Sequence, residues 1–563
     1  MKNLFYTFLI LNVLFVSHEA NAQEWLWAKR AGDGGFYHSG TDIVVDSQGN
    51  SYVTGHINGA TTINFSPTIS ITTTSTVSSF FLAKYDVSGN VLWVKKVDGL
   101  GSGSNKGWSA GTNIALDVTG NIYVVGEFTN DVSFGSTTLT TCTNTGVCAG
   151  QTHDFLAKYS NSGDVIWVKK VGAVSASGSG VKGLAVDGLG NSYIIGIFSN
   201  LSPATFGSIT LTTSSRSGFI AKYNTEGEAL WAKKGEVTGT ITPTTSISYI
   251  SIYVDSSGNL YSTGWSSGNS TTFDGNIVSG TNQQGGYIFT VKYNTEGNVV
   301  WARNMGNGGA RPFNNYVDNL DNVYISGELK HFTAKFGSYS FTSSGDSDIF
   351  IVKYDASGNV IWAKKAGGTQ PDGVNGGMKL DSQGNIYFAG NFSGTASFGS
   401  ITLTSAQYGE LYIAKYDNLG NAVWVKKSES GNGGGGPECY GFDIGAGGYY
   451  VTGKSSHSTN FGTIPIMGTG AGIFAAKLGA GITGIAEKVS SRLEVFPNPL
   501  EGEMLTIPNV RGASAKLLTL TGQELRSWTN IGEQISLQNV AAGMYLLEVS
   551  QNGQRRTAKV VVK

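Results

Sequence analysis

The sequence is poor in charge and in the residue types that usually carry metal or redox chemistry. Charged residues are 14% of 563, the formal net charge is −1, and there are only 6 His and 3 Cys. Nucleic-acid binding needs a basic face, so this balance argues against such a partner. The sequence contains no nucleophile elbow, no phosphate loop opening a helix and no His-rich metal motif. We therefore expect no cofactor, no metal and no enzymatic activity.

Long apolar runs are also lacking, apart from one at the start of the chain. Lys2 precedes the apolar run Leu4 to Val16, and Ala20-Asn21-Ala22 follows with small residues at its first and third positions. The run is too short to cross a membrane comfortably, and this order is typical of a cleaved signal peptide. The sequence thus predicts a signal peptide over residues 1–22, an exported protein and no transmembrane segment.

Cysteine is scarce, but two of the three lie close together. Cys142 and Cys148 share one polar loop, and in an oxidising compartment they could form a disulfide. Two free thiols are the alternative. His153 alone does not complete a zinc site with them, and Cys439 is left over. We expect the disulfide between Cys142 and Cys148.

Glycine is abundant, with 80 residues, and marks a repeated hairpin. Between Ala83 and Lys96, the sequence AKYDVSGNVLWVKK has a turn in which Gly89 and Asn90 accept positive φ and Asp86 can accept backbone hydrogen bonds. The β-branched and aromatic residues on both sides favour strands and argue against disorder. Its Trp-x-Lys/Arg mark recurs every 61 to 74 residues, at Trp27, Trp93, Trp167, Trp231, Trp301, Trp362 and Trp424.

Each repeat contains four predicted strands. A short apolar run ends in a tight turn, a Tyr-containing strand follows, then a Lys-Tyr strand and finally the Trp strand. The turn aspartates are predicted to cap their own hairpins; they are Asp46, Asp117, Asp187, Asp255, Asp318 and Asp381, with Asp443 in a degenerate seventh copy. Four antiparallel strands per repeat are typical of a β-propeller blade.

The order of the repeats predicts how the ring closes. The mature chain begins with a lone Trp strand, Glu24 to Arg30, and the last repeat stops after its third strand near Leu478. Pairing the two ends would remove an unpaired edge. The fold class expected is all-β: a seven-bladed propeller over residues 23–478, with the Trp strand outermost in each blade.

The marks D-x-x-G-N-x-Y-V and A-K-Y-D-x-x-G-N-V-x-W resemble the bacterial β-propeller repeat called SBBP, with a weaker likeness to NHL repeats. This resemblance covers roughly residues 23–478. It implies the propeller fold and says little about activity, because propellers host many functions.

Composition changes after Leu478. Residues 479–490 are predicted to be a linker, and residues 491–563 a small β module. The motifs Phe496-Pro497-Asn498-Pro499 and Ala542-Gly543-Met544-Tyr545 and the closing Lys559 to Lys563 resemble the type IX secretion C-terminal sorting domain. The resemblance implies a β-sandwich that engages the type IX machinery and a protein delivered to the cell surface or secreted.

Function is expected in the variable Gly-rich loops rather than in the repeated turns. Side chains in these loops include Tyr37, His38, Trp108 and Arg311, and also Tyr249, Asp372 and Glu438. Aromatic and polar groups meeting near the axis would suit a glycan or protein ligand; the alternative is that they pack locally. We predict a non-catalytic binding or adhesion module with Tyr37, His38, Trp108 and Arg311 as ligand contacts. The alternative function is a secreted polysaccharide lyase or hydrolase.

Overall fold

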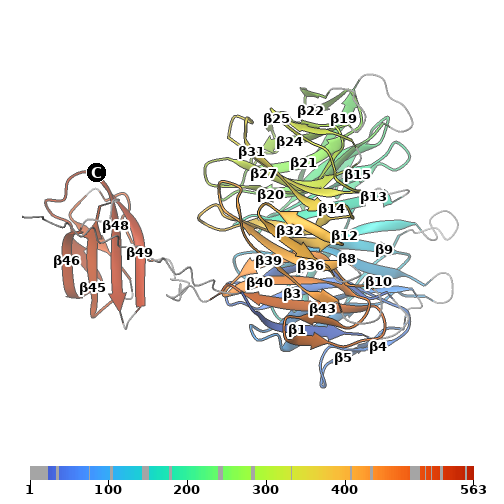
Figure 1. The fold of residues 1–563 in the computed structure, drawn as a ribbon, viewed down its shortest axis with the longest axis horizontal. Helices are drawn as coiled ribbons and strands as arrows, with labels where there is room; N and C mark the ends of the chain where they lie inside the picture. The colour runs from blue at the N-terminus through green and yellow to red at the C-terminus, as the bar shows by residue number, and fades with distance from the viewer. Residues whose placement is uncertain are drawn as a thin grey trace, which may run out of the picture. The chain divides into compact units, whose positions relative to one another are not determined.

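The computed structural model describes residues 23–32, 37–74, 77–101, 106–141, 151–175, 180–238, 245–280, 286–330, 332–405, 409–430, 435–481, 493, 495–500, 502–508, 510–519, 524–551 and 554–563. Their regular secondary structure is entirely β (Figure 1). Contacts separate a unit spanning Gln23–Ala480 from a second unit that holds the C-terminal strands. The predicted signal peptide, Cys142 and Cys148 lie outside the described residues.

The larger unit is the predicted all-β propeller. Its blades are antiparallel four-stranded units, numbered 1 to 7 along the chain. The inner strands are β2 (Ser39–Val45), β8 (Trp108–Leu116), β14 (Gly180–Val186), β20 (Ile247–Val254), β26 (Ala310–Val317), β32 (Gly373–Leu380) and β39 (Pro437–Gly445). The second strands are β3 (Ser51–Asn58), β9 (Ile122–Thr129), β15 (Ser192–Phe198), β21 (Leu260–Ser266), β27 (Val323–Leu329), β33 (Ile386–Phe392) and β40 (Gly448–Ser455).

The third strands are β6 (Ser78–Tyr85), β12 (Thr152–Tyr159), β18 (Ser217–Tyr223), β24 (Tyr287–Tyr293), β30 (Asp348–Tyr354), β36 (Glu410–Tyr416) and β43 (Gly472–Gly479). The outer strands, which carry the repeated Trp, are β7 (Val91–Val97), β13 (Val165–Ser175), β19 (Ala229–Thr238), β25 (Val299–Asn307), β31 (Val360–Gly368), β37 (Ala422–Lys427) and, in blade 7, β1 (Trp25–Ala31).

The ring closes as the order of the repeats indicated. Strand β1 pairs antiparallel with β43, with Trp27 opposite Lys477 and Ala31 opposite Ile473. Each inner strand contacts the next around the axis, and β39 of blade 7 contacts β2 of blade 1. The N-terminal strand therefore completes the last blade and covers an edge that would otherwise be unpaired.

Short hairpins join the second and third strands of the blades. They are β4 (Thr62–Asn64) with β5 (Ser70–Thr72), β10 (Val132–Phe134) with β11 (Thr137–Leu139), β16 (Ala204–Phe206) with β17 (Ile209–Leu211), β22 (Ser270–Phe273) with β23 (Asn276–Ser279), β28 (Ala334–Phe336) with β29 (Tyr339–Phe341), β34 (Thr395–Phe398) with β35 (Ile401–Thr404), and β41 (Thr459–Phe461) with β42 (Ile464–Ile466). Several pair with the outer strand of the preceding blade, as β22 does with β19; β41 pairs with the short strand β38 (Glu429–Ser430).

The turn aspartates cap their own hairpins, as predicted. Asp46 accepts the backbone N–H of Gln48 and of Asn50 at Oδ1, and the Tyr52 hydroxyl and Asn50 amide at Oδ2. The same set recurs around Asp187 and Asp381. These carboxylates are therefore used by the fold.

The repeated Trp joins neighbouring blades. The indole N–H of Trp167 in blade 2 donates to the Thr225 carbonyl in the turn of blade 3, at 2.9 Å. Trp27, Trp231 and Trp362 make the equivalent bond. A glycine of the same turn lies against the ring: a Cβ on Gly227 would come within 2.9 Å of Trp167. The Trp mark is thus a contact between blades.

The C-terminal unit has its own core. Strands β45 (Ala513–Leu518), β46 (Glu524–Ile531), β48 (Gly543–Gln551) and β49 (Gln554–Val562) form one sheet, and β44 (Met504–Thr506) pairs with β47 (Gln534–Ser536). Leu505, Ile535, Leu517 and Leu547 pack between them and are almost fully buried.

Candidate ligand-binding cavity

The inner strands enclose a cavity of about 700 Å³. All seven inner strands contribute residues to its wall. In each inner strand the lining residues begin at a local shift in the register with the second strand, such as the one between Gly40 and Asp42 in β2. A β-bulge re-aims the side chains that follow it. The volume lies within the range of small-ligand sites in proteins.

One level of the wall consists of the residues that pair with the repeated Tyr of the second strand. In blade order these are Val44, Ala115, Ala185, Tyr253, Tyr316, Lys379 and Asp443. The backbone repeats around the axis, but the side chains change from small to aromatic to charged. This level therefore gives the cavity different faces.

Blades 6, 7 and 1 supply the charged face. The Lys379 ammonium lies 3.1 Å from Asp443 Oδ1, and Asp443 Oδ2 accepts the backbone N–H of Val45 at 2.8 Å. Asp42 accepts the N–H of Ile43 at 2.9 Å and that of Ile114 at 3.0 Å. The two carboxylates thus satisfy backbone donors between blades while lining the cavity.

Electrostatics differ between these groups. Burial, with a smaller contribution from the charge of Asp443, raises the pKa of Asp42 to about 7, against the opposing effects of the Ile114 N–H and Lys379. Burial alone would lower the pKa of Lys379, but the attraction of Asp443 raises it. Lys379 is therefore held as a cation, and Asp42 can exchange a proton near neutral pH.

Blades 4 and 5 supply the aromatic face. The Tyr253 and Tyr316 rings lie with their centroids 4.4 Å apart, and Phe313 stands at the bulge of β26. Amide side chains of Asn113 and Asn375 also line the wall. Flat rings beside amides and carboxylates can stack on and hydrogen-bond to a hydroxyl-rich ligand.

Two of the predicted contact residues lie just before β2. Tyr37 is 66% exposed, and the Lys454 ammonium lies 5.4 Å from its ring centroid. His38 is fully buried, and its Nδ1 accepts the backbone N–H of Asn58. Burial lowers the pKa of His38 to about 4. His38 therefore packs inside the fold, and only Tyr37 of this pair faces solvent.

The other two lie on different blades. Trp108 is the first residue of β8 and is half-buried. The Arg311 guanidinium stacks on the Trp265 ring at 3.7 Å. None of Tyr37, His38, Trp108 and Arg311 lines the cavity. The inner strands themselves make the cavity wall, so the role of these four side chains as ligand contacts stays a prediction.

Other residues that the sequence singled out are occupied locally. Asp372 is almost fully buried and accepts the backbone N–H groups of Gly368 and Ser393. Tyr249 is buried, with its hydroxyl hydrogen-bonded to Tyr293. Local packing, the alternative considered above, describes both.

Sequence reasoning missed the charged face. Asp443 was aligned with the turn aspartates, but it pairs with Tyr450 inside the blade 7 sheet, at the level of Val44 in blade 1. The usable signal was the residue two positions before each turn Asp, since that position contains Val44, Ala115, Ala185, Tyr253, Tyr316 and Lys379. The residue type at this position varies between blades, which indicates a surface that the repeat does not determine.

No group of three or more metal-ligating side chains is found in the described part of the chain. Nor do the described residues contain a helix with the length and apolarity required to cross a membrane.

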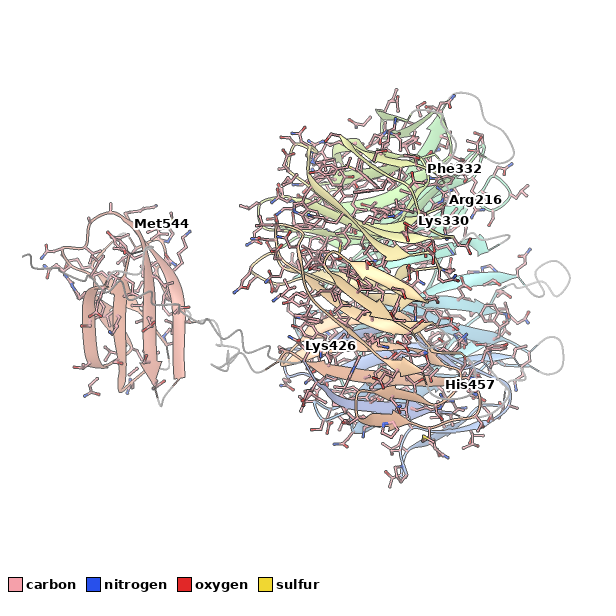
Figure 2. The ribbon with its side chains drawn as sticks, in the orientation of Figure 1. Arg216, Lys330, Phe332, Lys426, His457 and Met544 are labelled. Carbon is pink, nitrogen blue, oxygen red and sulfur yellow. The ribbon has the colours of Figure 1, made fainter. Side chains whose placement is uncertain are left out.

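Figure 2 shows the side chains of both units. Lys330, Phe332, Arg216 and Lys426 lie on the propeller unit, and Met544 lies on the C-terminal unit.

Comparisons with known proteins support both units. Residues 494–563 match a family model described as a secretion system C-terminal sorting domain, and residues 26–60 match a β-propeller repeat model. An uncharacterized WD repeat-containing protein of Acanthamoeba polyphaga mimivirus is 25% identical over 488 residues, which cover 72% of this chain. The chain spans about a third of that relative's length.

Solved structures give distant likenesses. PorZ, a surface component of the type IX secretion system of Porphyromonas gingivalis, is 10% identical, with coverage of 95% of this chain and 100% of PorZ and a TM-score of 0.24. The apocarotenoid oxygenase of Synechocystis is 12% identical, with coverage of 81% of this chain and 93% of the oxygenase chain and a TM-score of 0.35.

The match to the family model at residues 494–563 identifies the C-terminal module. It is a type IX sorting domain, and the protein is exported to the cell surface or secreted.

Proposed function

We propose that this exported propeller is a non-catalytic binding or adhesion module that holds an extracellular glycan in its axial cavity. The observation that carries the proposal is the non-repeating wall: a symmetric backbone places Phe313 and Tyr316 on one face and Lys379 and Asp443 on another. The repeated backbone does not by itself determine this variety of side chains. A glycan requires both stacking surfaces and hydrogen-bonding groups.

The site in this proposal differs from the loop site expected from sequence. The test is a glycan array on the exported protein, followed by titration calorimetry on the best ligand. Phe313→Ala and Asn375→Ala remove cavity groups, while Tyr37→Ala and Trp108→Ala remove loop groups as matched controls.

We expect about tenfold weaker binding in the cavity variants and less than twofold change in the loop variants. Weaker binding in the loop variants, with little change in the cavity variants, would indicate that the site lies in the loops. Equal loss in all four, with unchanged melting temperatures, would place binding elsewhere on the propeller.

One observation favours a second function, a polysaccharide lyase or hydrolase. Asp42 and Asp443 both line the cavity, and the pKa of Asp42 lies near 7, which suits proton transfer. Both carboxylates also accept backbone N–H groups, which explains their presence without catalysis. Release of shorter oligosaccharides by the wild type, and not by Asp42→Asn, would establish the enzyme instead of the binding module.

A further inference from the structure

We infer that the glycan held in the axial cavity is acidic, and that Lys182 binds its anionic group. This deepens the proposed function and rests on it. Lys182 stands at the bulge of β14 in blade 3 and lines the cavity. It belongs to neither the charged face of blades 6, 7 and 1 nor the aromatic face of blades 4 and 5.

The other charged groups of the cavity wall already have partners. Lys379 is paired with Asp443 at 3.1 Å. Asp42 is engaged by the backbone N–H groups of Ile43 and Ile114. Among the described residues, no hydrogen bond or ion pair of the Lys182 ammonium is found. Lys182 is therefore a cation of the cavity wall that makes no ion pair with any described residue.

The charge of Lys182 acts on one buried acid, Asp154. Asp154, in β12 of blade 2, is fully buried, and burial raises its pKa well above the ordinary range, with a further contribution from the charge of Glu127 and against the opposing effects of Lys182 and the Val181 N–H. No ion pair joins Asp154 to Lys182 among the described residues, and the raised pKa favours the neutral carboxyl group, which would not neutralise the ammonium. The ammonium thus stays available to a ligand.

The chemistry of the wall determines which ligand groups it can bind. An ammonium group is a compact point charge that attracts a carboxylate or a sulfate alike, whereas a guanidinium would favour planar, bidentate oxyanions. The remaining wall supplies amides from Asn113 and Asn375 and an aromatic surface from Phe313. A uronate or a sulfated sugar can bind the ammonium, the amides and the aromatic surface. The two sources share an anionic substituent on a hydroxyl-rich ring.

The experiment uses three sets of oligosaccharides of equal length: oligogalacturonides, the same oligomers with their carboxyl groups reduced, and sulfated galactan fragments. Each is titrated into the full exported protein and into Lys182→Met and Lys182→Arg. Lys426→Met is the matched control, because Lys426, labelled in Figure 2, lies on the outer strand β37 and does not line the cavity.

We expect at least tenfold tighter binding of one acidic ligand than of the carboxyl-reduced one, and loss of that preference in Lys182→Met but not in Lys426→Met. Partial retention in Lys182→Arg would confirm that charge matters. Preference for the uronate or the sulfate identifies the source.

Equal binding of acidic and reduced ligands, with sensitivity to Phe313→Ala, would overturn the acidic ligand and leave the glycan-binding function intact. An acidic preference that persists in Lys182→Met would overturn the role of Lys182. No binding of any glycan in these sets or on the array would overturn both proposals. Melting curves of the variants confirm that each is folded.

Discussion

The contact between Trp167 and the turn at Gly227 gives a quantitative test of how neighbouring blades are held together. Gly227 has φ of +75°, and a Cβ there would lie 2.9 Å from the Trp167 ring. Gly227→Ala therefore incurs a backbone penalty of about 1–2 kcal/mol and an overpacking penalty of about 1–3 kcal/mol. The expected total loss in the free energy of unfolding is about 2–5 kcal/mol.

Gly275 provides the control. Its φ is +85°, but nothing lies within 4 Å of a Cβ built there. Gly275→Ala should cost only the backbone penalty of about 1–2 kcal/mol. The difference between the two substitutions measures the packing of the turn against the Trp ring, because the backbone penalty is common to both.

A double-mutant cycle isolates the contact further. In a Trp167→Ala background, Gly227→Ala no longer meets the ring, so its cost should fall toward that of Gly275→Ala. The close neighbour that remains is the end of the flexible Lys169 side chain, which can move away. We expect a coupling of about 1–3 kcal/mol from urea unfolding followed by circular dichroism, compared at equal slope. Equal costs at Gly227 and Gly275 with zero coupling would refute the Trp–turn contact as a source of stability.

Three further predictions follow from the closure, the tail and the cavity. Deleting residues 24–30 should lower the melting temperature and the solubility together, because the edge of β43 loses its partner; a truncated protein that melts like the full chain would contradict the ring closure. Removing residues 491–563 should leave a folded propeller in the periplasm, seen by fractionation and circular dichroism, and normal surface delivery without them would contradict the sorting role. Because burial raises the pKa of Asp42 to about 7, the folded state binds a proton that the unfolded state releases, and stability should fall as pH rises from about 4 to 7. Asp42→Asn should reduce the difference in stability between pH 5 and pH 8 by about 2–3 kcal/mol, measured by urea midpoints; an unchanged difference would exclude Asp42 as its source.

Much of the fold was predictable because its determinants are local and repeated. The turn marks, the alternation of strands and the Trp mark each depend on neighbours within a few residues. Repetition also makes an altered copy recognisable. In the turn that begins at Asp318, Asp321 stands where the other copies have Gly, and the structure gives Asp321 a φ of +61°, the conformation that glycine adopts in the other copies. The unmatched strands at both ends indicated the closure.

The second basic residue of the Trp strand makes a contact that the sequence pattern does not reveal. Charge on an exposed strand discourages edge pairing, which is a sufficient reason for a lysine there. The structure adds a specific contact: Lys234, Lys365 and Lys427 each donate to a backbone carbonyl at the end of the short hairpin of the same blade. Such a contact joins segments about 20 residues apart, so short-range sequence patterns do not predict it.

The sequence by itself determined the repeat, the capped turns, the outermost Trp strand and the sorting module, because these follow from short-range propensity and from motif order. The tertiary structure alone decided the candidate site. Lys379, Asp443 and Asp42 are far apart in the chain and meet only because the ring brings blades 6, 7 and 1 around one axis. The loop residues were conspicuous in the sequence, but the side chains facing the axis are selected by the register and bulges of the inner strands, which only the assembled ring defines.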